Sequence, residues 1–449
     1  MNEKKCRNIN IYILICFCLS IGITFSIYPF IGLADGFSRW RFALEIVENG
    51  KITSDNLLSP ILPYFQAFTY KLTGSFGLYT FIQCFLFYLA CGLIFEVLIN
   101  QEVAIKNRIK IPLWIIISCM YLVIPTVLIF PAMLTDSAPV FILIAILYYI
   151  WSKSFHIALK ISMEMALVVL CVGIRINSVV LFMFVVLYFL IFFLFEKNKR
   201  HLLSATVILL ACILGMILPS KLNPVSHNAS TLGMVWELTE IASDNDNKEI
   251  IEELSKYGDV EKALDRIGEP YLNSIVWDNN PPFSAYDISG IYSKDITKLY
   301  LRTIINYPEQ FIRNKLHSIS NSLGLSNKLI SSGRGIHYLD ENTKRFGAVE
   351  SNQQIDIRNA FIKCTDFFGF LTLKPIILIV FCFILNIVLS FVHYRACWRL
   401  FGISCGYYSS FLVNTQAYEY RYFAPSFYLL LICAFYLVIQ LFILIKPYK

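Results

Sequence analysis

Residues 160–195 read KISMEMALVVLCVGIRINSVVLFMFVVLYFLIFFLF, an almost unbroken apolar run. As one α-helix this run would be about 54 Å long, whereas the hydrocarbon layer of a bilayer is about 30 Å thick. The run therefore predicts two membrane crossings, 160–174 and 178–195, with a break where Arg175 and Asn177 interrupt the apolar sequence. A chain that turns back in this way is typical of polytopic helical membrane proteins.

The same length argument, applied to the rest of the chain, predicts ten membrane spans. The 449 residues are 57% hydrophobic and 15% charged, with a mean hydropathy of +0.61, which excludes an ordinary soluble protein. The expected fold is an all-α polytopic membrane protein. Its predicted spans are 9–31, 77–99, 111–130, 137–152, 160–174, 178–195, 202–219, 371–392, 397–413 and 422–445.

Lysine and arginine residues are distributed unevenly between the two sides of these spans. They gather at both chain ends and in the alternate loops, whereas the short turns on the opposite side hold only Arg175 and Arg421. Because cytoplasmic loops carry the excess of basic residues, both termini are expected in the cytoplasm of a multi-pass inner-membrane protein. The net charge of +7 is thus a signal of topology, and nucleic acid is not an expected partner.

Two outer regions divide the chain into three parts. An amino-terminal membrane module, 1–219, contains a first outer loop at 32–76, and a carboxyl-terminal membrane module covers 371–449. Between these modules, 220–370 is polar enough and long enough for a mostly helical extracytoplasmic domain with its own core.

The outer regions also contain recognisable helical patterns. In the first outer loop, Phe37–Glu48 and Ile61–Leu72 mix aromatic residues with sparse charge, as helices lying in the headgroup plane do. In the outer domain, Val235–Tyr257 has helical apolar spacing. Lys294–Leu323 predicts two helices joined at Tyr307-Pro308, since proline favours the first turn of a helix.

Four charged residues map to the outer ends of the predicted spans: Asp35, Asp136, Arg175 and Arg421. Charges at the edge of a bilayer are costly and often functional. An arginine there can instead extend into the headgroups, and an aspartate can cap a helix. Because the short outer turns are otherwise almost uncharged, four such residues on one face favour a shared site over four separate structural roles.

Four features of the sequence together form a recognisable layout. They are Asp35 directly after the first span, interfacial helices in a long first outer loop, a recessed Arg175-Ile176-Asn177, and Tyr420-Arg421-Tyr422-x-x-Pro425 at the last span. This layout resembles the GT-C superfamily of membrane glycosyltransferases. The superfamily includes protein O-mannosyltransferases, lipid A aminoarabinose transferases and serotype-converting O-antigen glucosyltransferases. The chain length, the ten predicted spans and the single late outer domain are most similar to the glucosyltransferases.

The resemblance implies transfer of a sugar, for example glucose, from a polyprenyl-phosphate donor to a surface glycan such as O-antigen, and the sequence does not identify the sugar. Asp35 would act as the general base that deprotonates the acceptor hydroxyl, and attack opposite the lipid phosphate would invert the anomeric configuration. Arg175 and Arg421, together with Arg39 or Arg41, would stabilise the departing phosphate by charge-assisted hydrogen bonds.

Further substrate contacts follow from the same resemblance. Asp136 would orient hydroxyl groups, Asn177 would bind substrate beside the recessed arginine, and Trp40, Tyr420 and Tyr422 would stack on sugar rings. No cofactor is expected. A divalent metal lacks support, because the second acidic residue that some relatives carry after the catalytic aspartate is absent here.

Two other functions remain open from the sequence. An O-antigen polymerase would share the topology and the lipid-linked substrates, and two Arg-x10-Gly pairs, Arg313 to Gly324 and Arg358 to Gly369, resemble patterns in polymerase outer loops. A flippase or transporter of lipid-linked oligosaccharide is the alternative from another class. Transporters usually carry charge near the bilayer midplane and internal symmetry, and neither is evident in this sequence.

Overall fold

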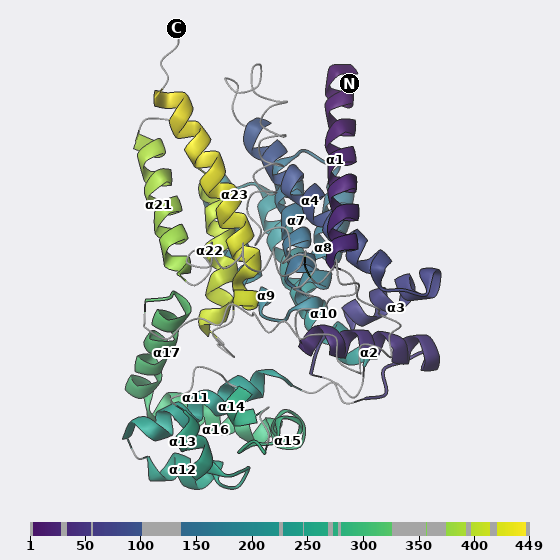
Figure 1. The fold of residues 1–449 in the computed structure, drawn as a ribbon. Coiled ribbons are helices and arrows are strands. Elements are labelled where there is room, and N and C mark those ends of the chain that lie inside the picture. The colour runs from purple at the N-terminus through teal and green to yellow at the C-terminus, as the bar shows by residue number, and fades with distance from the viewer. Residues whose placement is uncertain are drawn as a thin grey trace.

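The computed structural model describes residues 3–27, 34–54, 57–100, 136–223, 228–245, 247–267, 273–276, 280–325, 356, 374–391, 397–413 and 420–445. Within these residues every regular element is a helix (Figure 1). Five helices are long and apolar enough to cross a membrane, and three shorter apolar helices accompany them in the described part of the chain. The predicted third span, 111–130, lies outside the described residues.

Nine of the helices coincide with predicted spans and pack into one bundle. Their shared core includes Phe87, Phe141, Phe182, Tyr407 and Tyr428, all of which are buried. The nine are α1 (Glu3–Ile27), α4 (Gly77–Asn100), α7 (Ser137–Ser152), α8 (Ile157–Ile174), α9 (Ser178–Glu196), α10 (Lys199–Leu222), α21 (Pro375–Phe391), α22 (Trp398–Val413) and α23 (Tyr420–Ile445).

The break predicted inside the long apolar run is confirmed. Helix α8 ends at Ile174 with Arg175 as its C-cap, and α9 begins at Ser178 with Asn177 as its N-cap. Helix α10 then crosses so close to α8 that a side chain at Gly215 would not fit. A Cβ atom there would lie only 2.9 Å from the Val169 carbonyl oxygen. The three helices α8, α9 and α10 thus form one tightly packed group within the bundle.

The first outer loop folds into two helices, α2 (Ala34–Asn49) and α3 (Ile61–Thr73), close to the predicted positions. These helices pack on each other around a small apolar core of their own. A hydrogen bond of 2.5 Å from the Ser59 hydroxyl to the Gly173 carbonyl oxygen attaches the loop to the end of α8. The loop therefore lies against the bundle near the break at Arg175.

The outer domain is a separate helical unit with its own core, in which α11 is central. Its helices are α11 (Ser230–Asn245), α12 (Lys248–Leu254), α13 (Val260–Arg266), α14 (Asn273–Val276), α15 (Ala285–Ser289), α16 (Ser293–Asn306) and α17 (Pro308–Ser322). The predicted join at Tyr307-Pro308 is confirmed. The helical stretch predicted at Val235–Tyr257 is divided, because the Asn247 side chain caps a new helix at α12.

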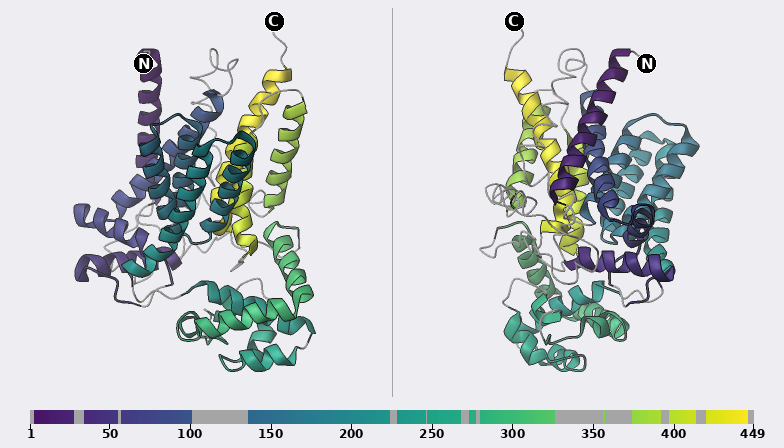
Figure 2. Two further views of the ribbon diagram at one scale, coloured as in Figure 1. Left: turned by 180° about the vertical axis from the view of Figure 1, so that it is seen from behind. Right: turned by 45° about the vertical axis from the view of Figure 1, so that its right-hand side comes forward.

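The start of α1 and the end of α23 lie at the same end of the bundle (Figure 1). Helices α2 and α3 and the outer domain lie at the opposite end, and the two further views agree (Figure 2). Following the predicted topology, we call the end with α2, α3 and the outer domain the outer end.

Candidate functional site

Asp136 and two arginines form a charged cluster at the outer end of the bundle. The Asp136 Oδ2 atom lies 3.2 Å from Arg39 Nη2 and 3.5 Å from Arg175 Nε. The side chains of Arg39, Arg175 and Asp136 are 3%, 9% and 14% exposed. Since charges so far out of water are stable only when paired, the three side chains hold one another in place.

Each member of this charged cluster comes from a different helix end. Arg39 lies in the first half of α2, Asp136 is the N-cap residue of α7, and Arg175 is the C-cap residue of α8. The Arg175 Nη1 atom also donates to the Ser137 hydroxyl at 3.3 Å. Contact between residues so distant in sequence requires both the break after α8 and the docking of the first outer loop.

The simpler structural roles fit this arrangement poorly. Asp136 occupies an N-cap position, but its side chain makes no capping hydrogen bond and instead contacts the two arginines. Arg175 is buried against Asp136 and does not reach for the headgroup region. Helix capping and snorkelling therefore do not explain why these charges are here.

Two buried polar side chains beside the charged cluster were not anticipated from the sequence. Tyr79, at the start of α4, interacts electrostatically with Arg39 and Asp136 and accepts a hydrogen bond from the Gln66 amide group. The Gln66 carbonyl oxygen is buried and has no hydrogen-bond partner among the described residues. Such an atom is rare in a folded protein and indicates a place for water or a polar ligand.

A tyrosine from the carboxyl-terminal module completes the surroundings. Tyr407 on α22 is fully buried and interacts electrostatically with Arg175 and Asp136. In the sequence, Tyr407 is one of many aromatic residues in an apolar span, so no pattern singles it out. Gln66 carried a weak signal, since it is the one amide residue in an otherwise apolar stretch of α3.

The structure separates the two neighbouring basic residues of α2. Arg39 faces Asp136, whereas the Arg41 side chain is 55% exposed and lies 3.9 Å from Glu45. Residues two positions apart point to nearly opposite sides of a helix, so only one of them can join the charged cluster. Of the alternatives Arg39 and Arg41, the geometry favours Arg39.

The assignment of Trp40 to sugar stacking needs correction. Trp40 is 3% exposed and stacks on Phe76, with ring centroids 4.4 Å apart. Its ring belongs to the small core between α2 and α3 and holds that loop together. The aromatic residue was correctly placed on a helix, but periodicity alone did not show which face of the helix is buried.

The remaining predicted residues are only partly placed. Asp35 is the second residue of α2, one turn before Arg39, and its side chain lies outside the described part of the structure. Tyr420, Arg421 and Tyr422 form the first turn of α23, and their side chains are also outside it. Asn177 is half-buried at the start of α9, two residues from Arg175. The roles of these five residues stay predictions.

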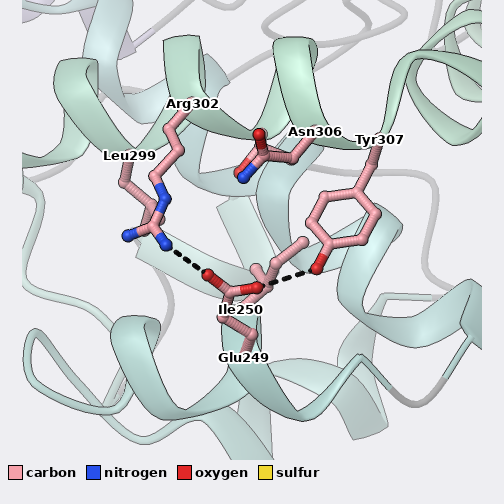
Figure 3. Close-up of a pocket in the computed structure, with 7 residues that line it drawn as sticks. Glu249, Ile250, Leu299, Arg302, Asn306 and Tyr307 are labelled. Atoms are coloured by element: carbon pink, nitrogen blue, oxygen red, sulfur yellow. Dashed lines mark hydrogen bonds and ion pairs between the residues drawn. The ribbon is translucent and has the colours of Figure 1, made fainter.

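The outer domain contains a shallow hollow between α12 and α16 (Figure 3). Glu249 accepts hydrogen bonds there from Arg302 at 2.6 Å and from Tyr307 at 2.9 Å. Both carboxylate oxygens of Glu249 are therefore engaged in joining two helices. The hollow serves packing of the outer domain and is a weaker candidate for chemistry than the charged cluster.

Comparison with models of known protein families, with curated proteins and with solved structures found no match for this chain.

Proposed function

We propose that the protein is an inverting glycosyltransferase of the GT-C type that uses a polyprenyl-phosphate sugar donor at the outer face of the bacterial inner membrane. The observation that carries the proposal is the buried cluster of Arg39, Asp136 and Arg175 at the outer end of an apolar helical bundle. Arginines held at the edge of a bilayer suit a ligand with an anionic head and an apolar tail.

The two guanidinium groups would bind the phosphate of the donor. A guanidinium has five N–H donors in a planar fork, so it can bind a carboxylate and a phosphate at the same time. As the bond to the sugar breaks, negative charge grows on the lipid phosphate, and fixed cations stabilise that charge. Asp136, which contacts both arginines, is assigned the role of positioning them, in place of the hydroxyl contact expected from the sequence.

Asp35 is the proposed general base. It lies one helical turn before Arg39, and residues four apart share a helix face, so the backbone of α2 directs both positions to the same side. Asp35 would take the proton from the acceptor hydroxyl while that oxygen attacks the anomeric carbon and the lipid phosphate leaves. The donor arrives already activated, so the reaction needs no nucleotide on this side of the membrane.

Gln66 and Tyr79 support a neutral, hydroxyl-rich group as part of the ligand. The two side chains are hydrogen-bonded to each other beside Arg39 and Asp136, and the buried Gln66 carbonyl oxygen has no further partner among the described residues. An amide and a phenol recognise sugar hydroxyls well, because each can both donate and accept hydrogen bonds. A phosphate alone would leave the Gln66 carbonyl oxygen without a donor.

Deletion of the gene tests the proposed function in the cell. Loss of a glycosyltransferase is expected to leave full-length surface glycan that lacks one sugar, seen by mass spectrometry of the released glycan. Single repeat units would instead indicate the polymerase alternative. Accumulation of lipid-linked sugar on the cytoplasmic side would indicate a flippase, and an unchanged glycan would contradict all three functions.

A further inference from the structure

Helix α17 has its polarity reversed relative to a helix of a soluble domain. Its fully buried residues are polar, with Asn314, Ser318 and Asn321 exposed by 8%, 3% and 1%, and Phe311 is the partly buried residue that packs on the outer-domain core. Its outward face carries Ile312 and Leu316, which are 56% and 61% exposed. Exposing large aliphatic side chains beside a buried polar stripe is unfavourable in water, so an apolar environment is expected on the outward side.

The carboxyl end of α17 is attached to the membrane bundle. The Tyr408 hydroxyl of α22 donates to the Ser322 carbonyl oxygen at 2.5 Å. Leu323, directly after α17, packs against the bundle core, and its carbonyl oxygen accepts from the Ile376 N–H at 3.4 Å. In Figures 1 and 2, α17 accordingly extends from the outer domain to the ends of α21 and α22.

These contacts fix the depth of α17 relative to the bundle. Tyr408 lies roughly 7 Å before the last residue of α22, Val413, at the usual rise of 1.5 Å per residue. Leu316 lies roughly 9 Å before Ser322 by the same rise. Leu316 therefore lies within roughly 9 Å of the residue through which α17 contacts α22, close to the end of the bundle where lipid headgroups are expected.

Charged residues on the outward face of α17 lie toward the end of the helix that is farther from the bundle. Glu309 and Arg313 form an ion pair of 3.1 Å at the end of α17 that is farther from the bundle. Leu316 lies nearer to the bundle with the exposed His317 beside it, and Leu325, with an exposed fraction of 62%, follows just after the helix. The ion pair is thus farther from the bundle than Leu316 and Leu325, as expected where apolar side chains meet the bilayer interface.

We propose that the apolar surface formed by Ile312 and Leu316 on α17 and by Leu325 just after it inserts into the headgroup region of the outer leaflet, with bilayer lipid as its partner. A second copy of the chain would not require the apolar side chains to be at this depth. Lipid contact adds a further attachment of the outer domain to the membrane, besides the chain connections. This inference does not depend on the proposed enzymatic activity.

A photo-crosslinking amino acid distinguishes the occupants of this surface. Leu316→p-benzoylphenylalanine places an apolar photoreactive group on the outward face of α17. The matched control is Glu252→p-benzoylphenylalanine, at an exposed position on α12, which lies away from the bundle (Figure 1). Full-length protein is reconstituted in vesicles of phosphatidylethanolamine and phosphatidylglycerol and irradiated, and adducts are identified by mass spectrometry.

Lipid adducts are expected to be severalfold more abundant at position 316 than at position 252. Equal lipid labelling at the two positions would overturn the inference. So would crosslinking at position 316 that is mainly to a second copy or to residues 326–373 of the same chain. Both positions are exposed, so the variants should fold, and gel filtration before irradiation verifies this.

Discussion

Asp136 is the residue on which two buried guanidinium groups meet, since its Oδ2 atom contacts both Arg39 and Arg175. Asp136 is therefore a member of a charged cluster, although its position in the sequence is also that of a helix cap. The contact also separates Arg39 from Arg41, which the sequence could not do. The distinction leads to a prediction with an internal control.

Arg39→Ala is expected to destabilise the protein by about 3 kcal/mol, because it leaves the carboxylate of a buried ion pair with one partner fewer. Arg41→Ala, on the exposed side of the same helix, should change stability by less than about 0.5 kcal/mol. Thermal unfolding of the purified variants in detergent compares them. Equal losses for the two variants would mean that the charged cluster does not hold the first outer loop on the bundle.

Gln66 offers a test that separates binding from folding. Gln66→Met keeps the length of the side chain and removes a buried amide whose carbonyl oxygen has no hydrogen-bond partner among the described residues. The substitution should change the apparent Tm little, because the loss of the hydrogen bond to Tyr79, about 1 kcal/mol, is offset by removal of an unsatisfied buried polar atom, which costs about 1–3 kcal/mol. Sugar transfer should nevertheless fall by about tenfold, the loss of roughly one good hydrogen bond to substrate. A lower Tm with normal transfer would show that the amide is purely structural.

At the scale of single residues, the sequence identified charges but not their neighbours. Asp136 and Arg175 were recognised because a charge in an apolar outer turn is conspicuous. Tyr407 and Tyr79 were missed because an aromatic residue in a span is most often core, and only the packing of distant helices brings them near the arginines. Trp40 was misassigned for the same reason, since its partner Phe76 lies in another part of the first outer loop.

At the scale of elements, helix ends were predictable where arithmetic or local chemistry determines them. The division of 160–195 followed from the thickness of the bilayer, and the join at Tyr307-Pro308 followed from the preference of proline for a first helical turn. The division between α11 and α12 was missed, because Asn247 acts as a cap inside a stretch with continuous apolar spacing.

The loop after α2 is held by hydrogen bonds to the Glu45 carboxylate, and these bonds are sensitive to acid. Glu45 accepts hydrogen bonds from Thr53 N–H at 2.8 Å, Thr53 Oγ1 at 3.1 Å and Ser54 N–H at 3.1 Å, and also from the Ser54 hydroxyl. Burial by itself raises the pKa of the Glu45 carboxyl, but these hydrogen bonds together bring the pKa below its usual value. The carboxylate form is therefore favoured by the folded loop.

Because the pKa of Glu45 is lowered in the folded state, its hydrogen bonds contribute stability above the pKa of an unfolded glutamate, about 4.3. This stability is lost as the pH falls through the pKa of Glu45 in the folded protein. Hydrogen exchange of the amides of Thr53 and Ser54, corrected for the intrinsic rate, should accelerate below that pH. Glu45→Gln should remove the pH dependence and leave these amides weakly protected throughout. Strong protection in acid for the original chain would contradict the assigned role of Glu45.

At the scale of the whole molecule, the described helices form an apolar bundle with a helical domain at one end. The start of α1 and the end of α23 lie at the other end (Figure 1). That both termini lie in the cytoplasm is a prediction from the distribution of lysine and arginine. Nine of the ten predicted spans correspond to helices, and the predicted third span, 111–130, lies outside the described residues.

Elements that are far apart in the sequence contribute residues to the outer end of the bundle. The first outer loop supplies Arg39 and Asp35, the turn after α8 supplies Arg175, and the carboxyl-terminal module supplies Tyr407. The modules 1–219 and 371–449 therefore both place side chains around the charged cluster. The cluster depends on long-range packing, and for that reason its geometry could not be predicted from the sequence.

Transfer of labelled glucose tests the central claim most directly. The purified chain in lipid vesicles is given polyprenyl-phosphate glucose and surface glycan from a strain that lacks the gene. The original chain is expected to label the glycan. Asp35→Asn should lower the rate by about 10²–10⁴-fold while folding normally, since it removes the general base. Undiminished transfer by Asp35→Asn, or no transfer by the original chain, would contradict the account.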